Sequence, residues 1–181
     1  MKRSERLMRN TIFVMAGLVV LELGVNRLSA DDRTPPDLST LRDFTSIEVE
    51  GDFSLDVVHD TGYSVVYAPA NPSEGRFYAS VRNNTLQLGG FRNEAGSRVR
   101  VTMPKLSKLN AGRVKTLTVT GFDGASLQLN MDTIPQVTLR SNAVQQWQIR
   151  ADHVADLQID RASMGAGKVD LAGRATLSVI D

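Results

Sequence analysis

The sequence predicts an all-β protein, and three observations carry that prediction. From Leu41 onward the 181-residue chain shows no helical periodicity of apolar residues. Apolar and polar residues instead alternate in short runs, as they do in half-buried strands. From Leu117 the same pattern returns every ten residues for the remaining 65 positions, which indicates a repeat architecture.

The first half of the β region predicts a series of short strands. Strict alternation is clearest at Ile47 to Gly51 and at Phe53 to Val57. Turn signals such as Asp60-Thr61-Gly62 and Asn83-Asn84 separate the runs. Since the connections are short, we expect residues 44–104 to pair mostly as antiparallel strands. The expected strands are 47–51, 53–57, 63–67, 77–81, 85–88 and 98–103.

The second half carries columns of apolar residues spaced ten apart. A polar residue stands between the two apolar positions of each unit, as Gln148 stands between Trp147 and Ile149. A third apolar column, which includes Ile134, precedes each pair and predicts corners that point into a core. The two main columns are Leu117, Leu127, Val137, Trp147 and Leu157, and Val119, Leu129, Leu139, Ile149 and Ile159.

Two folds explain this period. One is a β-solenoid in which two ten-residue units complete a coil of twenty; the alternative is an antiparallel β-sandwich. Tight hairpins favour Asn-Gly or Asp-Gly turns, and only Asp123-Gly124 supplies one in this half. The turn chemistry therefore favours the solenoid, in which Gln128 would lie beside Gln148.

The first 30 residues differ in composition from the rest. Four basic residues fall within residues 2–9, and a mostly apolar, uncharged stretch follows at 11–21. This order is typical of a secretory signal peptide, and we expect cleavage after Ala30. The apolar stretch is about half of the roughly 20 residues that a spanning helix needs. The alternative is an uncleaved anchor, which would then be the chain's only contact with a membrane.

Removal of residues 1–30 changes the charge. Of 21 basic and 20 acidic residues, five basic and two acidic ones lie in that segment, so the remainder carries 16 and 18, a net charge of −2. Residues 31–41, with Pro35-Pro36, predict a polar extended leader, and residues 42–181 a single β domain. This charge gives no reason to expect nucleic acid as a partner. The absence of cysteine excludes a disulfide scaffold and a cysteine nucleophile.

Three segments in order resemble one known family. Phe44 to Val57, Asn84 to Leu88 and Val99 to Leu109 are similar to successive landmarks of the head GIN domain, also named the putative auto-transporter adhesin domain. The resemblance spans residues 42–181 and implies a secreted or envelope-located β-helix-like domain with no established enzyme activity. The turns Ser141-Asn142-Ala143 and Ala151-Asp152-His153 depart from the family, because they lack its glycine.

No catalytic or cofactor-binding residue is predicted, because the chain has no nucleophile elbow, phosphate-binding loop or H-E-x-x-H motif. His59 and His153 are expected to be solvated turn residues. Asp132 and Asp152, twenty residues apart, are the only metal-ligand candidates, since they would stack on adjacent coils. Calcium takes about six to eight oxygen ligands, so we expect a solvated face without metal.

Aromatic residues offer one further site hypothesis. Trp147, the only tryptophan, lies in an inward column and is expected in the core. Tyr63 and Tyr67 share a strand face, so they and Tyr78 are expected to be half-buried. The alternative is an aromatic platform that binds carbohydrate.

These observations predict an exported, non-catalytic β-helical module of the bacterial cell envelope, periplasmic or secreted, with an adhesive, binding or structural role. The alternative is a polysaccharide-active enzyme on a short β-helix, which would need a carboxylate cluster. An envelope protein or a glycan is the expected partner, with no cofactor. The C-terminal strand Leu177 to Ile180 would present an exposed edge, through which a homodimer could form.

Overall fold

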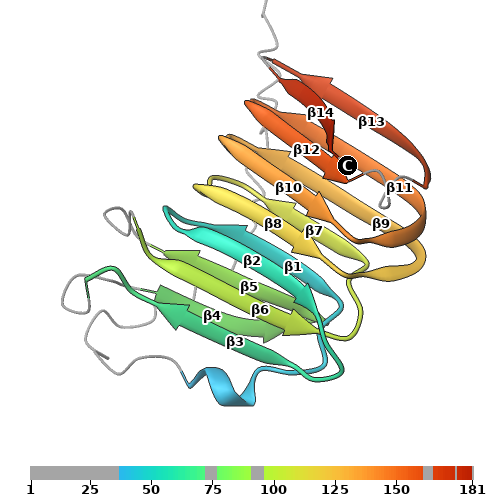
Figure 1. Ribbon diagram of the computed structural model, residues 1–181. Coiled ribbons are helices and arrows are strands. Elements are labelled where there is room, and N and C mark those ends of the chain that lie inside the picture. The colour runs from blue at the N-terminus through green and yellow to red at the C-terminus, as the bar shows by residue number, and fades with distance from the viewer. Residues whose placement is uncertain (1–36, 72–76, 91–95, 161–164, 174, 181) are drawn as a thin grey trace, which may run out of the picture. The chain divides into compact units, whose positions relative to one another are not determined.

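The computed structural model describes residues 37–71, 77–90, 96–160, 165–173 and 175–180. This part of the chain forms two seven-stranded sheets and one short 3₁₀ helix, η1 (Leu38–Thr40) (Figure 1). None of its helices is long and apolar enough to cross a membrane. The predicted signal segment 1–30, its cleavage site after Ala30 and leader residues 31–36 lie outside the described residues.

The two sheets divide the strands between them. Sheet A has the order β13-β11-β9-β7-β1-β5-β4, and sheet B has the order β14-β12-β10-β8-β2-β6-β3. The strands of sheet A are β1 (Ser46–Glu50), β4 (Phe77–Arg82), β5 (Thr85–Gly90), β7 (Lys108–Ala111), β9 (Asp123–Asp132), β11 (Ala143–Asp152) and β13 (Ala166–Ala172). The strands of sheet B are β2 (Ser54–His59), β3 (Ser64–Ala68), β6 (Arg98–Met103), β8 (Thr116–Thr120), β10 (Gln136–Arg140), β12 (Asp156–Asp160) and β14 (Thr176–Ile180).

From β7 to β14 the chain passes alternately between the two sheets. Each strand pairs in parallel with the strand two further along the chain, so Leu127 lies opposite Trp147 and Val137 opposite Leu157. Gln128 lies opposite Gln148, as predicted. The all-β class and the twenty-residue offset are therefore confirmed.

The expectation that residues 44–104 pair mostly as antiparallel strands holds for only half of the strand pairs in this range. β1 pairs in parallel with β5 and β7, and β2 in parallel with β6 and β8. Among the described strands, β3–β6 and β4–β5 are the antiparallel pairs. Consecutive strands such as β1 and β2 lie in opposite sheets, so the short turn between them changes sheet and does not close a hairpin.

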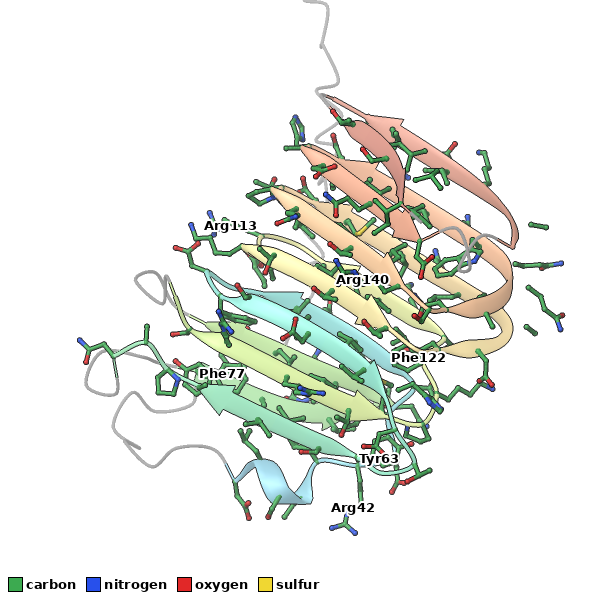
Figure 2. All side chains as sticks on the ribbon, in the orientation of Figure 1. Arg42, Tyr63, Phe77, Arg113, Phe122 and Arg140 are labelled. Atoms are coloured by element: carbon green, nitrogen blue, oxygen red, sulfur yellow. The ribbon has the colours of Figure 1, made fainter. Side chains whose placement is uncertain are left out.

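Stacked apolar columns from both sheets form one core (Figure 2). Burial alternates along β8, whose Leu117 and Val119 are buried. The predicted inward corners are confirmed, because Val114, Ile134, Val144 and Val154 are all buried. Each large apolar side chain contributes about 1.5–3 kcal/mol when it is buried in such a column.

Trp147 belongs to this core, as expected, and is 7% exposed. Its neighbour on β13 is Gly167, where a Cβ would overlap the Trp147 side chain and backbone. The glycine therefore lets the backbone of β13 approach the Trp147 backbone and Cβ closely at this point of the column. The indole N–H is buried and has no hydrogen-bond acceptor among the described residues.

Two turns of this chain that lack the family's glycine still contain a residue with a left-handed backbone. Ser141 and His153 have left-handed backbones with φ of 52°. Twenty residues away from each stands a glycine with positive φ, Gly121 before Ser141 and Gly173 after His153. The turn geometry is thus kept even where the glycine that best suits it is replaced.

Aromatic side chains close the core at the β3 and β4 end. Tyr63 packs on Phe44 with ring centroids 4.8 Å apart, and Tyr67 stacks on Phe77 at 4.4 Å. Both tyrosines are half-buried against the core, as expected of sheet residues. Each of these rings packs on a phenylalanine, which speaks against the alternative of an exposed carbohydrate platform at Tyr63 and Tyr67. Tyr78 differs, since it is 46% exposed.

Candidate functional site

The outward face of sheet A carries a continuous row of polar side chains. The parallel register places Gln87, Glu48, Asn110, Asn130 and Arg150 beside one another on β5, β1, β7, β9 and β11. These residues face outward because they alternate with buried neighbours along each strand. The row therefore follows directly from the two-residue period of a strand combined with an exact strand register.

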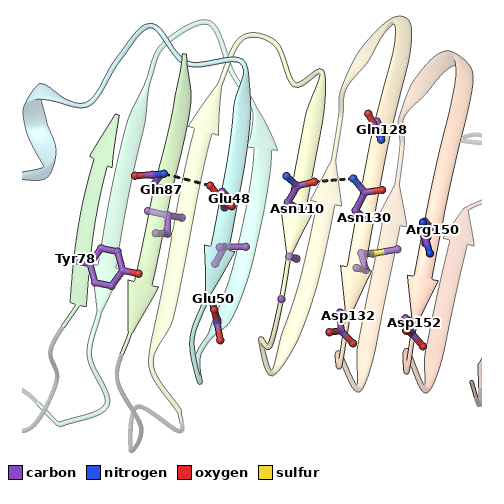
Figure 3. A pocket seen from close by; sticks show the side chains of 15 residues that line it. Glu48, Glu50, Tyr78, Gln87, Asn110, Gln128, Asn130, Asp132, Arg150 and Asp152 are labelled. Carbon is purple, nitrogen blue, oxygen red and sulfur yellow. Dashed lines mark hydrogen bonds between the residues drawn. The ribbon is translucent and has the colours of Figure 1, made fainter. Parts of the chain in front are cut away.

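Hydrogen bonds connect neighbours within this row. Asn130 Nδ2 donates to Asn110 Oδ1 over 2.8 Å, and Gln87 Nε2 donates to Glu48 Oε2 over 3.4 Å. These bonds fix the orientation of three amide groups on an otherwise open surface (Figure 3). Each amide still has donor or acceptor capacity left, because a side-chain amide carries two donor hydrogens and an oxygen with two lone pairs.

The row lies along an open groove of about 860 Å³ on sheet A. Within the groove β7 ends at Ala111, whose side chain is buried, and Gly112 follows it without a side chain. The lining residues are Glu48, Val49, Glu50, Tyr78, Gln87, Leu88, Asn110, Ala111, Gly112, Gln128, Asn130, Met131, Asp132, Arg150 and Asp152.

Tyr78 forms one wall of the groove (Figure 3). Its partner on β5 is Gly89, and the three atoms that a Cβ at Gly89 would overlap all belong to the Tyr78 side chain. The end of the ring thus lies over the Gly89 backbone and points toward Glu50, which pairs with Gly89 from the other side. A glycine at this position lets an exposed aromatic ring lie across the sheet.

The opposite end of the groove holds the two predicted metal-ligand candidates. Asp132 and Asp152 lie opposite each other at the ends of β9 and β11, where like charges destabilise the pair. His153 Nδ1 lies 2.9 Å from Asp152 Oδ1 and 3.7 Å from Asp132 Oδ1. A protonated imidazole there would offset the repulsion, although all three side chains are at least half exposed. His153 is a solvated turn residue, as expected, but the sequence did not predict its place in this cluster.

These three residues could offer one ligand atom each to a metal ion, within 4.8 Å of one another. Calcium takes about six to eight oxygen ligands. Three exposed side chains would therefore bind it only weakly. We therefore expect the thermal midpoint of unfolding to be the same with and without millimolar calcium, measured by circular dichroism. A rise in the midpoint with calcium that Asp152→Ala abolishes would contradict this prediction and assign a metal site to the cluster.

Acidic groups dominate the charge of the groove. Glu48, Glu50, Asp132 and Asp152 oppose a single lining cation, Arg150. Arg113 adds a weak contact, with its guanidinium 3.7 Å from Glu50 Oε1 and both side chains more than half exposed. Exposed pairs of this kind contribute about 0–1 kcal/mol. The groove therefore favours neutral or cationic ligands over anionic ones.

Residues 43–181 match the family model described as "Putative auto-transporter adhesin, head GIN domain". The chain belongs to this family. The resemblance seen in the sequence is confirmed, and the match includes every strand of both sheets.

Two solved structures are similar to this head GIN domain. One is a putative adhesin from Bacteroides fragilis, with 16% identity and a TM-score of 0.53 over 76% of this chain and 69% of that chain. The other is a putative adhesin from Parabacteroides merdae, with 7% identity and a TM-score of 0.37 over 78% of this chain and 93% of that chain. The first match shows a shared fold. No curated protein matches the chain.

The sequence predicted part of the groove. The spacing of Asp132 and Asp152 placed them together correctly, and the twenty-residue period also predicted the neighbours Gln128 and Gln148. The sequence did not predict that Tyr78 is more exposed than Tyr63 and Tyr67, or that its ring lies over the backbone of Gly89. That contact depends on the pairing of β4 with β5, for which the turn signal Asn83-Asn84 was the available clue. The family's description as a putative adhesin is consistent with a binding role.

Proposed function

We propose that this head GIN domain is an exported, non-catalytic binding module of a bacterial cell envelope, and that the groove on sheet A is its binding surface. The observation that carries the proposal is the row of five hydrogen-bonding side chains across β5, β1, β7, β9 and β11. Such a surface offers many directional polar contacts on a rigid sheet. The family description as an adhesin supports a binding role.

Export forms part of this proposal. Residues 1–30 serve as a signal peptide cleaved after Ala30, or as an uncleaved anchor, and residues 31–41 form a polar leader. The mature protein is then periplasmic or secreted. Its intact mass after capture from the envelope fraction separates the two alternatives, because cleavage removes residues 1–30 and an anchor keeps them.

We also propose that residues 42–181 form a short β-solenoid, with the β-sandwich as the alternative. The support is the regular passage from sheet to sheet, with parallel neighbours twenty residues apart from β7 to β14. A sandwich built of hairpins would pair consecutive strands in antiparallel fashion. The antiparallel strands β3 and β4 then close one end of the stack.

Sedimentation with isolated host envelopes tests the binding role. The mature protein is expected to pellet with envelopes in a saturable manner. Asn130→Lys places a long cation in the middle of the polar row and should weaken this binding at least about tenfold, a loss of about 1.4 kcal/mol. Gln136→Lys is the matched control, because Gln136 is exposed on β10 of sheet B. Equal binding by the two variants would contradict the assignment of the groove.

A second copy of the chain is the partner that we propose for the β13 and β14 end. Val169, Leu171, Leu177 and Val179 occupy inward columns there, yet they are 36–48% exposed. Antiparallel pairing of two β13 edges centred on Val169 would place Lys168 opposite the partner's Asp170, twice. The four exposed apolar residues and this charge pattern would therefore match the same surface on a second copy of the chain.

Sedimentation equilibrium measures this association. We expect a concentration-dependent dimer, which Val179→Lys weakens because it places a charge in the shared core end. Val66→Lys is the control, since Val66 is 53% exposed on β3 at the other end of sheet B. A mature protein that stays monomeric at high concentration would overturn the dimer.

A further inference from the structure

We infer that the groove on sheet A binds a neutral, extended polysaccharide chain, an inference that rests on the proposed binding function. The side chains that line the groove carry this inference.

The polar row offers the hydrogen-bond donors and acceptors that sugar hydroxyls need. A sugar hydroxyl both donates and accepts, and so do the amides of Gln87, Asn110 and Asn130. Glu48 adds a carboxylate that accepts hydrogen bonds, and Arg150 adds a planar donor. Adjacent side chains in the row can therefore bind the neighbouring hydroxyls of one sugar ring.

Tyr78 supplies the apolar part of the site. Sugar rings present a face of C–H groups, which packs on an aromatic ring while the hydroxyls at its edge remain free to bind polar groups. The Tyr78 ring is 46% exposed, and it is held across the sheet because Gly89 has no side chain. The apolar ring of a tyrosine can contact the C–H face of a sugar, while its hydroxyl can form hydrogen bonds at the edge of the sugar ring.

The direction of the groove suits a polymer. The row runs across five strands, with neighbouring strands about 4.8 Å apart. This spacing is close to the length of one pyranose unit in an extended β-linked chain, so successive sugars would meet successive strands. Because the groove lies on an open sheet face and is lined from several strands, an extended chain could contact several strands at once.

Charge and polarity decide between this ligand and others. Four carboxylates against one arginine disfavour an acidic polysaccharide. Protein interfaces concentrate aromatic and aliphatic side chains at their centre. Tyr78 is the one large apolar side chain exposed in the described groove, so a protein partner would lack such a centre.

Calorimetric titration of the mature protein with defined hexasaccharides tests this inference. We expect saturable binding of cellohexaose and of the N-acetylglucosamine hexamer, and much weaker binding of hexagalacturonate. Tyr78→Ala should weaken binding about threefold to tenfold by removing the ring contact. Tyr78→Phe should keep most of the affinity. Val66→Ala is the control for loss of an exposed apolar residue on the other sheet.

Gly89→Ala provides a second variant that leaves the ring in the protein. The three atoms nearest to the added Cβ all belong to the end of the Tyr78 side chain, so we expect the ring to move while the sheet remains intact. Binding of the neutral hexamers should fall as it does in Tyr78→Ala, with an unchanged β-sheet circular dichroism spectrum. The mass of each hexamer after incubation should also be unchanged, because a cleaved product would favour the enzyme alternative.

Three outcomes would overturn the inference: no binding of either neutral hexamer at millimolar concentration, tighter binding of hexagalacturonate, or neutral binding that Tyr78→Ala and Gly89→Ala leave unchanged. Envelope binding that Asn130→Lys still weakens would then preserve the proposed function and direct the search to a protein ligand. Loss of both results would refute the groove as a binding surface.

Discussion

Ile149→Asp is expected to abolish folding of the mature protein, whereas Gln148→Ala should leave it folded. Ile149 is 2% exposed, and its neighbours on β9 and β13 are Leu129 and Val169. Loss of a large buried side chain costs about 2–5 kcal/mol, and burial of an unpaired carboxylate costs more. Domains are stable by only about 5–15 kcal/mol, so the sum removes most or all of the stability.

Soluble yield and urea unfolding followed by circular dichroism measure this effect. Gln148 is exposed one residue away on the same strand, which makes its alanine variant a close control for position and expression. Surface substitutions usually change stability by less than about 0.5 kcal/mol. If both variants were equally soluble and equally stable, the assignment of inward and outward columns would be wrong.

Asn142→Ala has the second-largest expected effect. Asn142 is fully buried at the turn before β11. Its Oδ1 accepts a hydrogen bond from the Phe122 amide over 2.9 Å, and its Nδ2 donates to the Val119 carbonyl over 3.0 Å. One side chain thus satisfies two backbone groups about twenty residues earlier in the chain. Alanine would remove both hydrogen bonds, and loss of the acceptor for the Phe122 amide alone costs about 1–3 kcal/mol.

Asn130→Ala is the matched control for Asn142→Ala. Asn130 is half-buried and makes its hydrogen bond to the Asn110 side chain on the open face of sheet A. Because water can replace that bond, we expect a loss below about 1 kcal/mol. Similar urea midpoints for the two variants would contradict the role of Asn142 as a bridge between neighbouring turns of the stack.

The sequence was most informative where the chain repeats itself. The ten-residue columns predicted which side chains of β8 to β12 point inward, because a repeat gives several independent readings of one pattern. The same columns predicted that Val137 and Leu157 would be neighbours. Asp132 and Asp152 met in the candidate site for the same reason.

Prediction failed where pairing depends on distant segments. β1 lies between β5 and β7. Glu48 on β1 pairs with Gln87, which comes 39 residues later, and with Asn110, which comes 62 residues later. No repeat marks these offsets, so short turns suggested antiparallel neighbours. The contact of Tyr78 with Gly89 was not predicted for a related reason. It joins residues on two separate strands, and such a contact leaves no periodic pattern in the sequence.

Site-specific photo-crosslinking in the native host tests most directly whether the groove on sheet A is the binding surface. A photoreactive residue is placed at Asn110 or Asn130 in the groove, and at Thr118 on the outward side of β8 in sheet B. Crosslinks to envelope material are expected from both groove positions and not from Thr118. Crosslinks that form from Thr118 while Asn110 and Asn130 give none would contradict the groove as the binding surface.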